Sequence, residues 1–90
     1  MPEIARYLGI KIFIHYRDHP PPHFHVRYAG DRATISIETM QILEGRLPTR
    51  VYALIAEWAF HHQPLLRENW QRAKAHEALL SIPPVEVVRC

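Results

Sequence analysis

Three segments in the first half of the chain alternate apolar and polar side chains with a period of two residues. They are GIKIFIHY at residues 9–16, HFHVRYA at 23–29 and RATISIE at 32–38. A period of two places the apolar side chains on one face of a β-strand and the polar side chains on the other. Because short connections join the segments, the pattern predicts an antiparallel meander with one apolar and one polar face.

The connection between the second and third segments predicts how these strands pair. A two-residue hairpin loop that begins with glycine is typical of a primed turn, and Gly-Asp occupies residues 30–31. A hairpin closed there places His25 opposite Ser36 and His23 opposite Glu38. Both pairs fall on the polar face, as the alternation independently requires.

The second half of the chain has the spacing of amphipathic helices. Apolar side chains recur every three or four residues over residues 51–62. Pro48 favours the start of this helix, and Pro64 must end or kink it because proline lacks an N–H donor. A second helix is predicted over residues 64–76.

Together these patterns predict a single α+β domain over residues 1–90. Residues 1–45 form a three- to four-stranded antiparallel meander, whose short fourth strand lies at 41–44. Residues 48–76 form two helices that pack on the apolar face of the sheet. Residues 79–90 form an extended tail, either docked as an edge strand or loose.

Composition restricts the cellular setting more than the chemistry. The chain has 90 residues, which allow one domain, and a formal net charge of +2, which is too small to indicate nucleic-acid binding alone. Arginine provides nine of the eleven basic residues and suits bidentate contacts with phosphate or carboxylate. The one cysteine, Cys90, excludes an internal disulfide, and the sequence has no apolar secretory or membrane-spanning run. We therefore expect a soluble cytoplasmic protein with no membrane partner.

The stretch DHPPPHFHV at residues 18–26 concentrates the side chains that could carry chemistry. It holds three of the four histidines found between residues 15 and 25, three consecutive prolines and an aspartate. The predicted sheet gathers basic, imidazole and acidic side chains on its polar face: Lys11, His15, His23, His25, Arg27, Ser36 and Glu38. From the residues alone, three interpretations of this group remain open.

The first interpretation is a metal site. His23 and His25 are two residues apart on a strand, so both imidazoles point the same way. His15 from the neighbouring strand would complete a three-histidine set with an open position for zinc or another divalent metal. Asp18 or Glu38 would add a carboxylate ligand or a hydrogen-bond acceptor behind the histidines.

The second interpretation is metal-independent cleavage of RNA, which needs no cofactor. Histidine takes and gives protons near neutral pH, so His23 and His25 would act as acid and base. Glu38, opposite His23 in the predicted register, would fix the tautomer of that ring. Lys11 and Arg27 would hold a phosphate and stabilise the charge that develops on it.

The third interpretation is a structural hairpin in a non-enzymatic protein-interaction module. Asp18 would cap a turn, with His19 beside it in the supporting loop. The prolines, Pro21 and Pro22 among them, would fix an extended connection and reduce the entropy of the unfolded chain. The histidines would then hydrogen-bond backbone groups at the open end of the hairpin.

Beyond individual residues, the chain resembles a known family. The segments that carry the resemblance are MPEIARYLGIKI, DHPPPHFHV, ISIETMQILEGRLP, AEWAFHHQPLLRENW and IPPV. Together they are similar to the domain of unknown function 4160 family, small proteins of bacteria and archaea. The family pattern maps onto Asp18, His19, Pro21, Pro22, His23, Phe24 and His25, and it does not include His15.

The resemblance implies a biological setting but no activity. Members of the family often form one half of a two-gene unit, beside another small protein, which has suggested toxin–antitoxin systems. The resemblance thus implies a toxin-like or accessory component that binds a small protein partner encoded by a neighbouring gene. RNA is a further candidate partner, and an exposed sheet edge with a small core is compatible with a homodimer.

Overall fold

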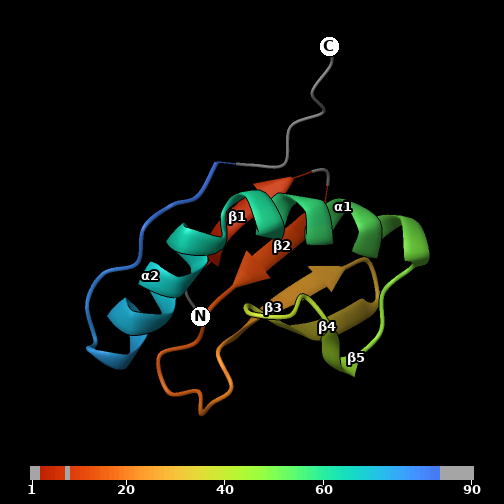
Figure 1. Cartoon of the computed structure of the whole chain (residues 1–90). Helices are drawn as coiled ribbons and strands as arrows, with labels where there is room; N and C mark the ends of the chain where they lie inside the picture. Colours follow the sequence, from red (N-terminus) through yellow and green to blue (C-terminus); the bar gives the residue numbers. More distant parts are fainter. Residues whose placement is uncertain (1–2, 8, 84–90) are drawn as a thin grey trace.

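A computed structural model describes residues 3–7 and 9–83 of the chain. It contains two helices and a five-stranded antiparallel sheet in which strands that are neighbours in the sequence are neighbours in space. Both helices cover the same face of the sheet (Figure 1). The predicted α+β class is therefore confirmed, with five strands rather than three or four. The elements are β1 (Glu3–Tyr7), β2 (Ile10–Phe13), β3 (His23–Tyr28), β4 (Asp31–Ser36), β5 (Ile42–Gly45), α1 (Thr49–His61) and α2 (Gln63–Lys74).

The apolar face of the sheet and the inner sides of both helices form one core. These are the residues that the two periodicities assign to the interior, and their burial is the main stabilising contribution to the fold. Because the helices cover one face only, the other face of the sheet stays open for polar side chains. The central core residues are Ile10, Ile12, Ile14, Phe24, Val26, Ile35 and Ile37 from the sheet side and Val51, Ile55, Trp58, Ala59, Leu66, Trp70 and Ala73 from the helices.

The alternation did not predict β1. Its buried side chains, Ile4 and Ala5, are consecutive, and its pairing with β2 shifts register between Glu3 and Ala5. An irregularity of this kind breaks the period of two that identifies a strand in a sequence. The sequence of β1 therefore lacks the alternation that usually identifies a strand.

The hairpin between β3 and β4 closes one residue earlier than the Gly-Asp turn predicts. Tyr28 pairs with Asp31, so the two loop residues are 29–30. His23 consequently lies opposite Ser36, and the predicted register is wrong by two residues. A shift of two keeps the alternation of polar and apolar faces along both strands. His23 at the start of β3 is nevertheless buried and packs against Trp70 of α2.

The two prolines act at the helix ends as predicted. α1 begins directly after Pro48, and Pro64 lies in the first turn of α2, where an N–H would have no helical partner. His62 joins the two helices. None of the helices in the described part of the chain is long and apolar enough to cross a membrane.

The described part of the predicted tail is held against α2 without forming a strand. Asn69, which is fully buried, donates a hydrogen bond to the carbonyl of Leu80 and accepts one from its N–H. Ile82 is buried in the core. Residues 84–90 of the predicted tail lie outside the described residues.

The turn between β3 and β4 contains a strain that one substitution can remove. Ala29 has a φ of 53°, in the left-handed region that costs an L-residue about 1–2 kcal/mol. We expect Ala29→Gly to raise the free energy of unfolding by about 0.5–1 kcal/mol, because glycine adopts this φ freely but loses more entropy on folding. Urea denaturation measures the change, and a decrease in stability would contradict this description of the turn.

At the end of β5, in contrast to Ala29, a glycine already occupies a position with positive φ, Gly45. It has a φ of 83°, and a Cβ added there would collide with the backbone of Arg32 on β4. We therefore expect Gly45→Ala to lower the free energy of unfolding in the same assay, since both the φ and the space favour glycine.

Candidate functional site

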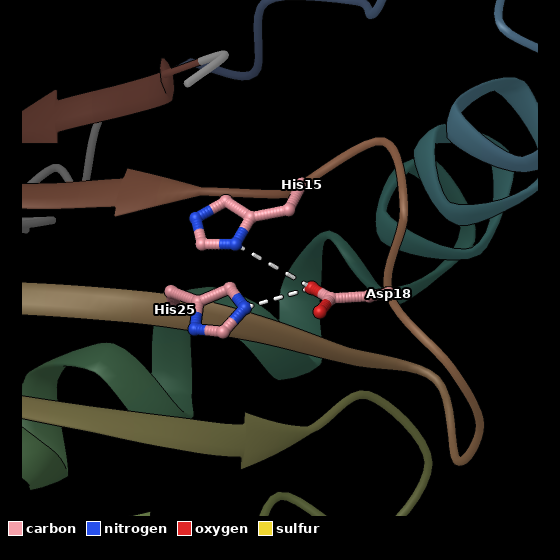
Figure 2. A group of neighbouring side chains, drawn as sticks. All are labelled: His15, Asp18 and His25. Carbon is pink, nitrogen blue, oxygen red and sulfur yellow. Dashed lines mark hydrogen bonds and ion pairs between the residues drawn. The ribbon is translucent and has the colours of Figure 1, made fainter.

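A single carboxylate organises the loop between β2 and β3. The Oδ2 atom of Asp18 lies 2.8 Å from His25 Nε2 and 3.1 Å from His23 Nε2. His15 Nδ1 lies 3.7 Å from the same oxygen. Figure 2 shows the rings of His15 and His25 pointing toward this carboxylate. We call these four residues the Asp18 cluster.

The prolines shape the loop that carries Asp18 back to the sheet. The three prolines at 20–22 have no N–H donors, so this segment cannot pair as a regular strand. The Pro20–Pro21 peptide bond is cis. The carbonyl of Pro22 accepts a hydrogen bond of 3.0 Å from the N–H of Ile37, which ties the end of the loop to the segment after β4.

His23 is the most buried imidazole of the cluster, with 10% of its side chain exposed. Its Nδ1–H donates to the Pro21 carbonyl over 2.7 Å, and its ring packs 5.1 Å from the ring of Trp70 on α2. A carbonyl only accepts hydrogen bonds, so Nδ1 must carry the hydrogen. His23 therefore anchors the loop to the helix layer more than it faces solvent.

His25 has a partner for each of its ring nitrogens. Nε2 donates to Asp18 Oδ2 over 2.8 Å, and Nδ1 lies 3.4 Å from the hydroxyl of Thr34. A hydroxyl can donate or accept, so the Thr34 contact is compatible with either protonation state of Nδ1. Because the carboxylate fixes Nε2, Nδ1 is the nitrogen available for proton exchange.

The rings of His15 and His25 stack on each other. Their centroids are 3.9 Å apart and their planes differ by 13°. Burial lowers the pKa of His15, and the charge of His25 lowers it further, against the opposing charge of Asp18. Two imidazolium rings at this distance repel, so the stack disfavours a positive charge on both rings at once.

Asp18 remains an anion at neutral pH. Burial by itself raises the pKa of the Asp18 carboxyl, but the hydrogen bond from His25 and the charges of His23, His25 and His15 outweigh it and lower this pKa below its ordinary value. A carboxylate in this position stabilises a positive charge on the histidines around it.

A groove on the polar face of the sheet begins at the stacked pair. It has a volume of about 480 Å³ and runs over β2 to β5. Cationic, hydroxyl and carboxylate side chains line it together with the two imidazoles. We call it the polar groove, and its lining side chains include Phe13, His15, His25, Arg27, Arg32, Thr34 and Glu44.

The structure brings most of the predicted site residues together. His15, Asp18, His23 and His25 meet in one cluster, and Arg27 lines the groove beside it. Lys11 pairs with Arg27 across β2 and β3. His19 is exposed in the loop.

Glu38 is the predicted site residue that lies elsewhere. The predicted contact with His23 depended on the wrong hairpin register. Glu38 instead accepts two hydrogen bonds, of 2.8 and 3.0 Å, from the guanidinium of Arg67 on α2. This contact holds the pKa of Glu38 below its ordinary value. Glu38 therefore links the turn after β4 to α2.

Arg32 and Thr34 line the groove and are among its residues for which the sequence predicted no role. The alternation of residues 32–38 already placed both side chains on the polar face. The register error placed Thr34 opposite Arg27, whereas it lies opposite His25. Its contact with the imidazole could not be recognised without the correct pairing.

Part of the cluster also has the donor set of a metal site. One ligand atom each from His15, Asp18 and His25 lies within 4.8 Å of the others. Two imidazole nitrogens and one carboxylate oxygen suit zinc and other divalent metals. His23, the fourth member of the predicted ligand set, would stand behind these three because its Nδ1–H is held by the Pro21 carbonyl.

Comparison with known proteins gives a family and no further relative. A family model described as "Domain of unknown function (DUF4160)" matches residues 9–71, which include the cluster and the groove. No curated protein and no solved structure shows significant similarity to the chain.

The stacked pair predicts the direction in which His15 titrates. We expect its imidazole to titrate below the ordinary value of 6.5 in an NMR pH titration, because burial and His25 both favour the neutral ring. Asp18→Asn should lower the pKa of His15 further, since it removes the charge that opposes these effects. A His15 that titrates above 6.5, or rises in the Asp18 variant, would contradict the arrangement.

Proposed function

The chain belongs to the family described as Domain of unknown function (DUF4160), and we propose that this member cleaves RNA by metal-independent acid–base chemistry at the Asp18 cluster. One observation carries the proposal. A stacked imidazole pair, in contact with a carboxylate, opens into a groove lined by arginines. Acid, base and anion-binding groups are the parts that this reaction needs.

The chemistry assigns different tasks to the two stacked rings. RNA is cleaved when its 2′-hydroxyl attacks the adjacent phosphorus and the 5′-oxygen leaves, which gives a 2′,3′-cyclic phosphate. His15, whose pKa is lowered mainly by burial, is the neutral base that takes the 2′-hydroxyl proton. His25, hydrogen-bonded to the Asp18 carboxylate, is the acid that protonates the leaving oxygen.

The remaining groups orient the pair and bind the phosphate. Asp18 holds Nε2 of His25 and thereby presents Nδ1 toward the hydroxyl of Thr34 in the groove. Arg27 supplies a positive charge for the phosphate in the groove. His23, buried against Trp70, positions the loop in this mechanism and takes no part in proton transfer. We therefore propose His15 and His25 as the acid–base pair, in place of His23 and His25.

For the biological setting, we propose a toxin-like component of a two-gene unit that a small protein partner restrains. The family resemblance supports this setting. The outer strand β5 offers a surface for the partner or a second copy, because Ile42 and Leu43 are 38% and 47% exposed on it. An edge strand with exposed apolar side chains is prone to pair with another chain.

The catalytic proposal makes a direct prediction for purified, untagged protein. We expect cleavage of single-stranded RNA to 2′,3′-cyclic phosphate ends in the presence of EDTA. His15→Ala and His25→Ala should each reduce the rate by about 10²-fold or more, the usual contribution of an acid or base. His61→Ala, at an exposed position on α1, is the matched histidine control and should leave the rate unchanged. Equal rates for all three variants would disprove the mechanism.

In cells, the same pair should determine toxicity. We expect induced expression to inhibit growth, and the His15→Ala/His25→Ala double variant to allow growth at the same protein level. Co-expression of the neighbouring gene should restore growth with the unaltered chain. A double variant that folds and remains equally toxic would exclude this chemistry and favour a non-enzymatic interaction module.

A metal-binding function is the second candidate, because three ligand atoms already lie together at His15, Asp18 and His25. Metal analysis of untagged protein separates the two functions. The acid–base proposal predicts no stoichiometric metal after dialysis. One equivalent of zinc that disappears in the His15→Ala and His25→Ala variants would replace it with a metal site.

A further inference from the structure

Four basic side chains lie side by side across four neighbouring strands. Arg6 on β1 is paired with Lys11 on β2, and Lys11 is paired with Arg27 on β3. Arg27 is in turn paired with Arg32 on β4. Residues directly opposite each other in an antiparallel sheet point to the same face. We call these four residues the cation row.

Three of the four cations form no ion pair with a carboxylate among the described residues. Arg6 is neutralised by Glu3, which accepts two hydrogen bonds from its guanidinium. No described carboxylate lies within 4.0 Å of a charged nitrogen of Lys11, Arg27 or Arg32. Like charges directly opposite each other destabilise an antiparallel pair. An arrangement that opposes folding in this way points to an anion that binds from outside.

The cation row lies two residues along the strands from the stacked histidines, on the same face of the sheet. His25 precedes Arg27 by two residues on β3, a separation of about 7 Å on the same face. Thr34 follows Arg32 by the same step on β4. Arg27 and Arg32 also line the polar groove, so the row and the cluster belong to one continuous surface.

We propose that Lys11, Arg27 and Arg32 bind successive phosphates of a single-stranded nucleic acid that crosses the strands of the sheet. The polar groove then receives the nucleotide whose 3′-phosphate lies at His15 and His25. The identity of the ligand as RNA rests on the proposed function, whereas the positions of the cations do not.

A single strand fits this surface better than a duplex. The row is a short line of charges across one face of the sheet, beside a groove of about 480 Å³. An unpaired strand can turn one base into such a groove, as proteins that recognise unpaired RNA require. A base-paired helix keeps its bases stacked inside and its 2′-hydroxyls out of line with the leaving oxygens.

The test measures binding separately from cleavage. The probe is a fluorescent 2′-O-methyl RNA of ten nucleotides, which cannot undergo 2′-hydroxyl attack, and anisotropy reports its affinity at increasing KCl. Three phosphate contacts predict a slope of log K against log salt of about −2, since each contact on a single strand contributes about −0.7. Lys11→Gln, Arg27→Gln and Arg32→Gln should each reduce the magnitude of the slope by about 0.7.

Two controls separate a binding role from a structural one. Lys74→Gln removes an exposed cation on α2, away from the polar face, and should leave the slope unchanged. The melting temperature of Arg32→Gln should stay the same or rise, because this substitution removes a like-charge contact. A residue needed only for folding would lower it.

The outcomes distinguish this inference from the proposed function. The predicted slopes without any cleavage of natural RNA would support the cation row and disprove the ribonuclease. If Lys11→Gln, Arg27→Gln and Arg32→Gln cleave RNA as fast as the unaltered chain, the proposal that the cation row binds phosphates is wrong. Equal affinity for a duplex of the same sequence would also overturn it. So would tighter binding to polyglutamate or to phosphatidylserine vesicles, which would identify an acidic protein or a membrane as the anion.

Discussion

The hydrogen bond between Asp18 and His25 is the contact on which the candidate functional surface depends. It joins a proline-rich loop to a strand of the sheet, and it fixes one nitrogen of an imidazole whose other nitrogen points toward the groove. The same oxygen lies within 4 Å of His15 and His23. Without this carboxylate, the loop would lose one of its contacts with the sheet, and the three rings would have no common counter-charge.

The sheet allows such a site because its two faces have separate tasks. One face meets both helices and forms the core, which is closed further by the buried amide of Asn69 and its two hydrogen bonds to Leu80. The other face needs no cover, and it can carry histidines and cations without burying an unpaired charge. A domain of this size has one core to stabilise it, so a polar face of this kind is tolerated only if the opposite face is well packed.

Several features of the polar face oppose stability. Cations face each other across strands β2, β3 and β4, and two imidazoles stack over one carboxylate. By contrast, the paired charges elsewhere on the surface, such as Glu38 with Arg67, form ordinary exposed ion pairs that contribute little. Local conflicts of this type, in an otherwise consistent fold, are expected where a ligand supplies the missing partner.

The sequence by itself determined which side chains of the strands face the core, where the helices lie and which residues belong to the polar face. Periods of two and of three to four residues assign the core, and Pro48 and Pro64 mark the helix ends because proline lacks an N–H. Only the tertiary structure decided which polar residues touch. A hairpin shifted by two residues keeps the same pattern of faces, so alternation could not distinguish Ser36 from Glu38 as the partner of His23. The irregular pairing of β1 removed the alternation that would have predicted this strand. The position of Asp18 depends on the contacts of a loop, and such contacts follow no sequence periodicity.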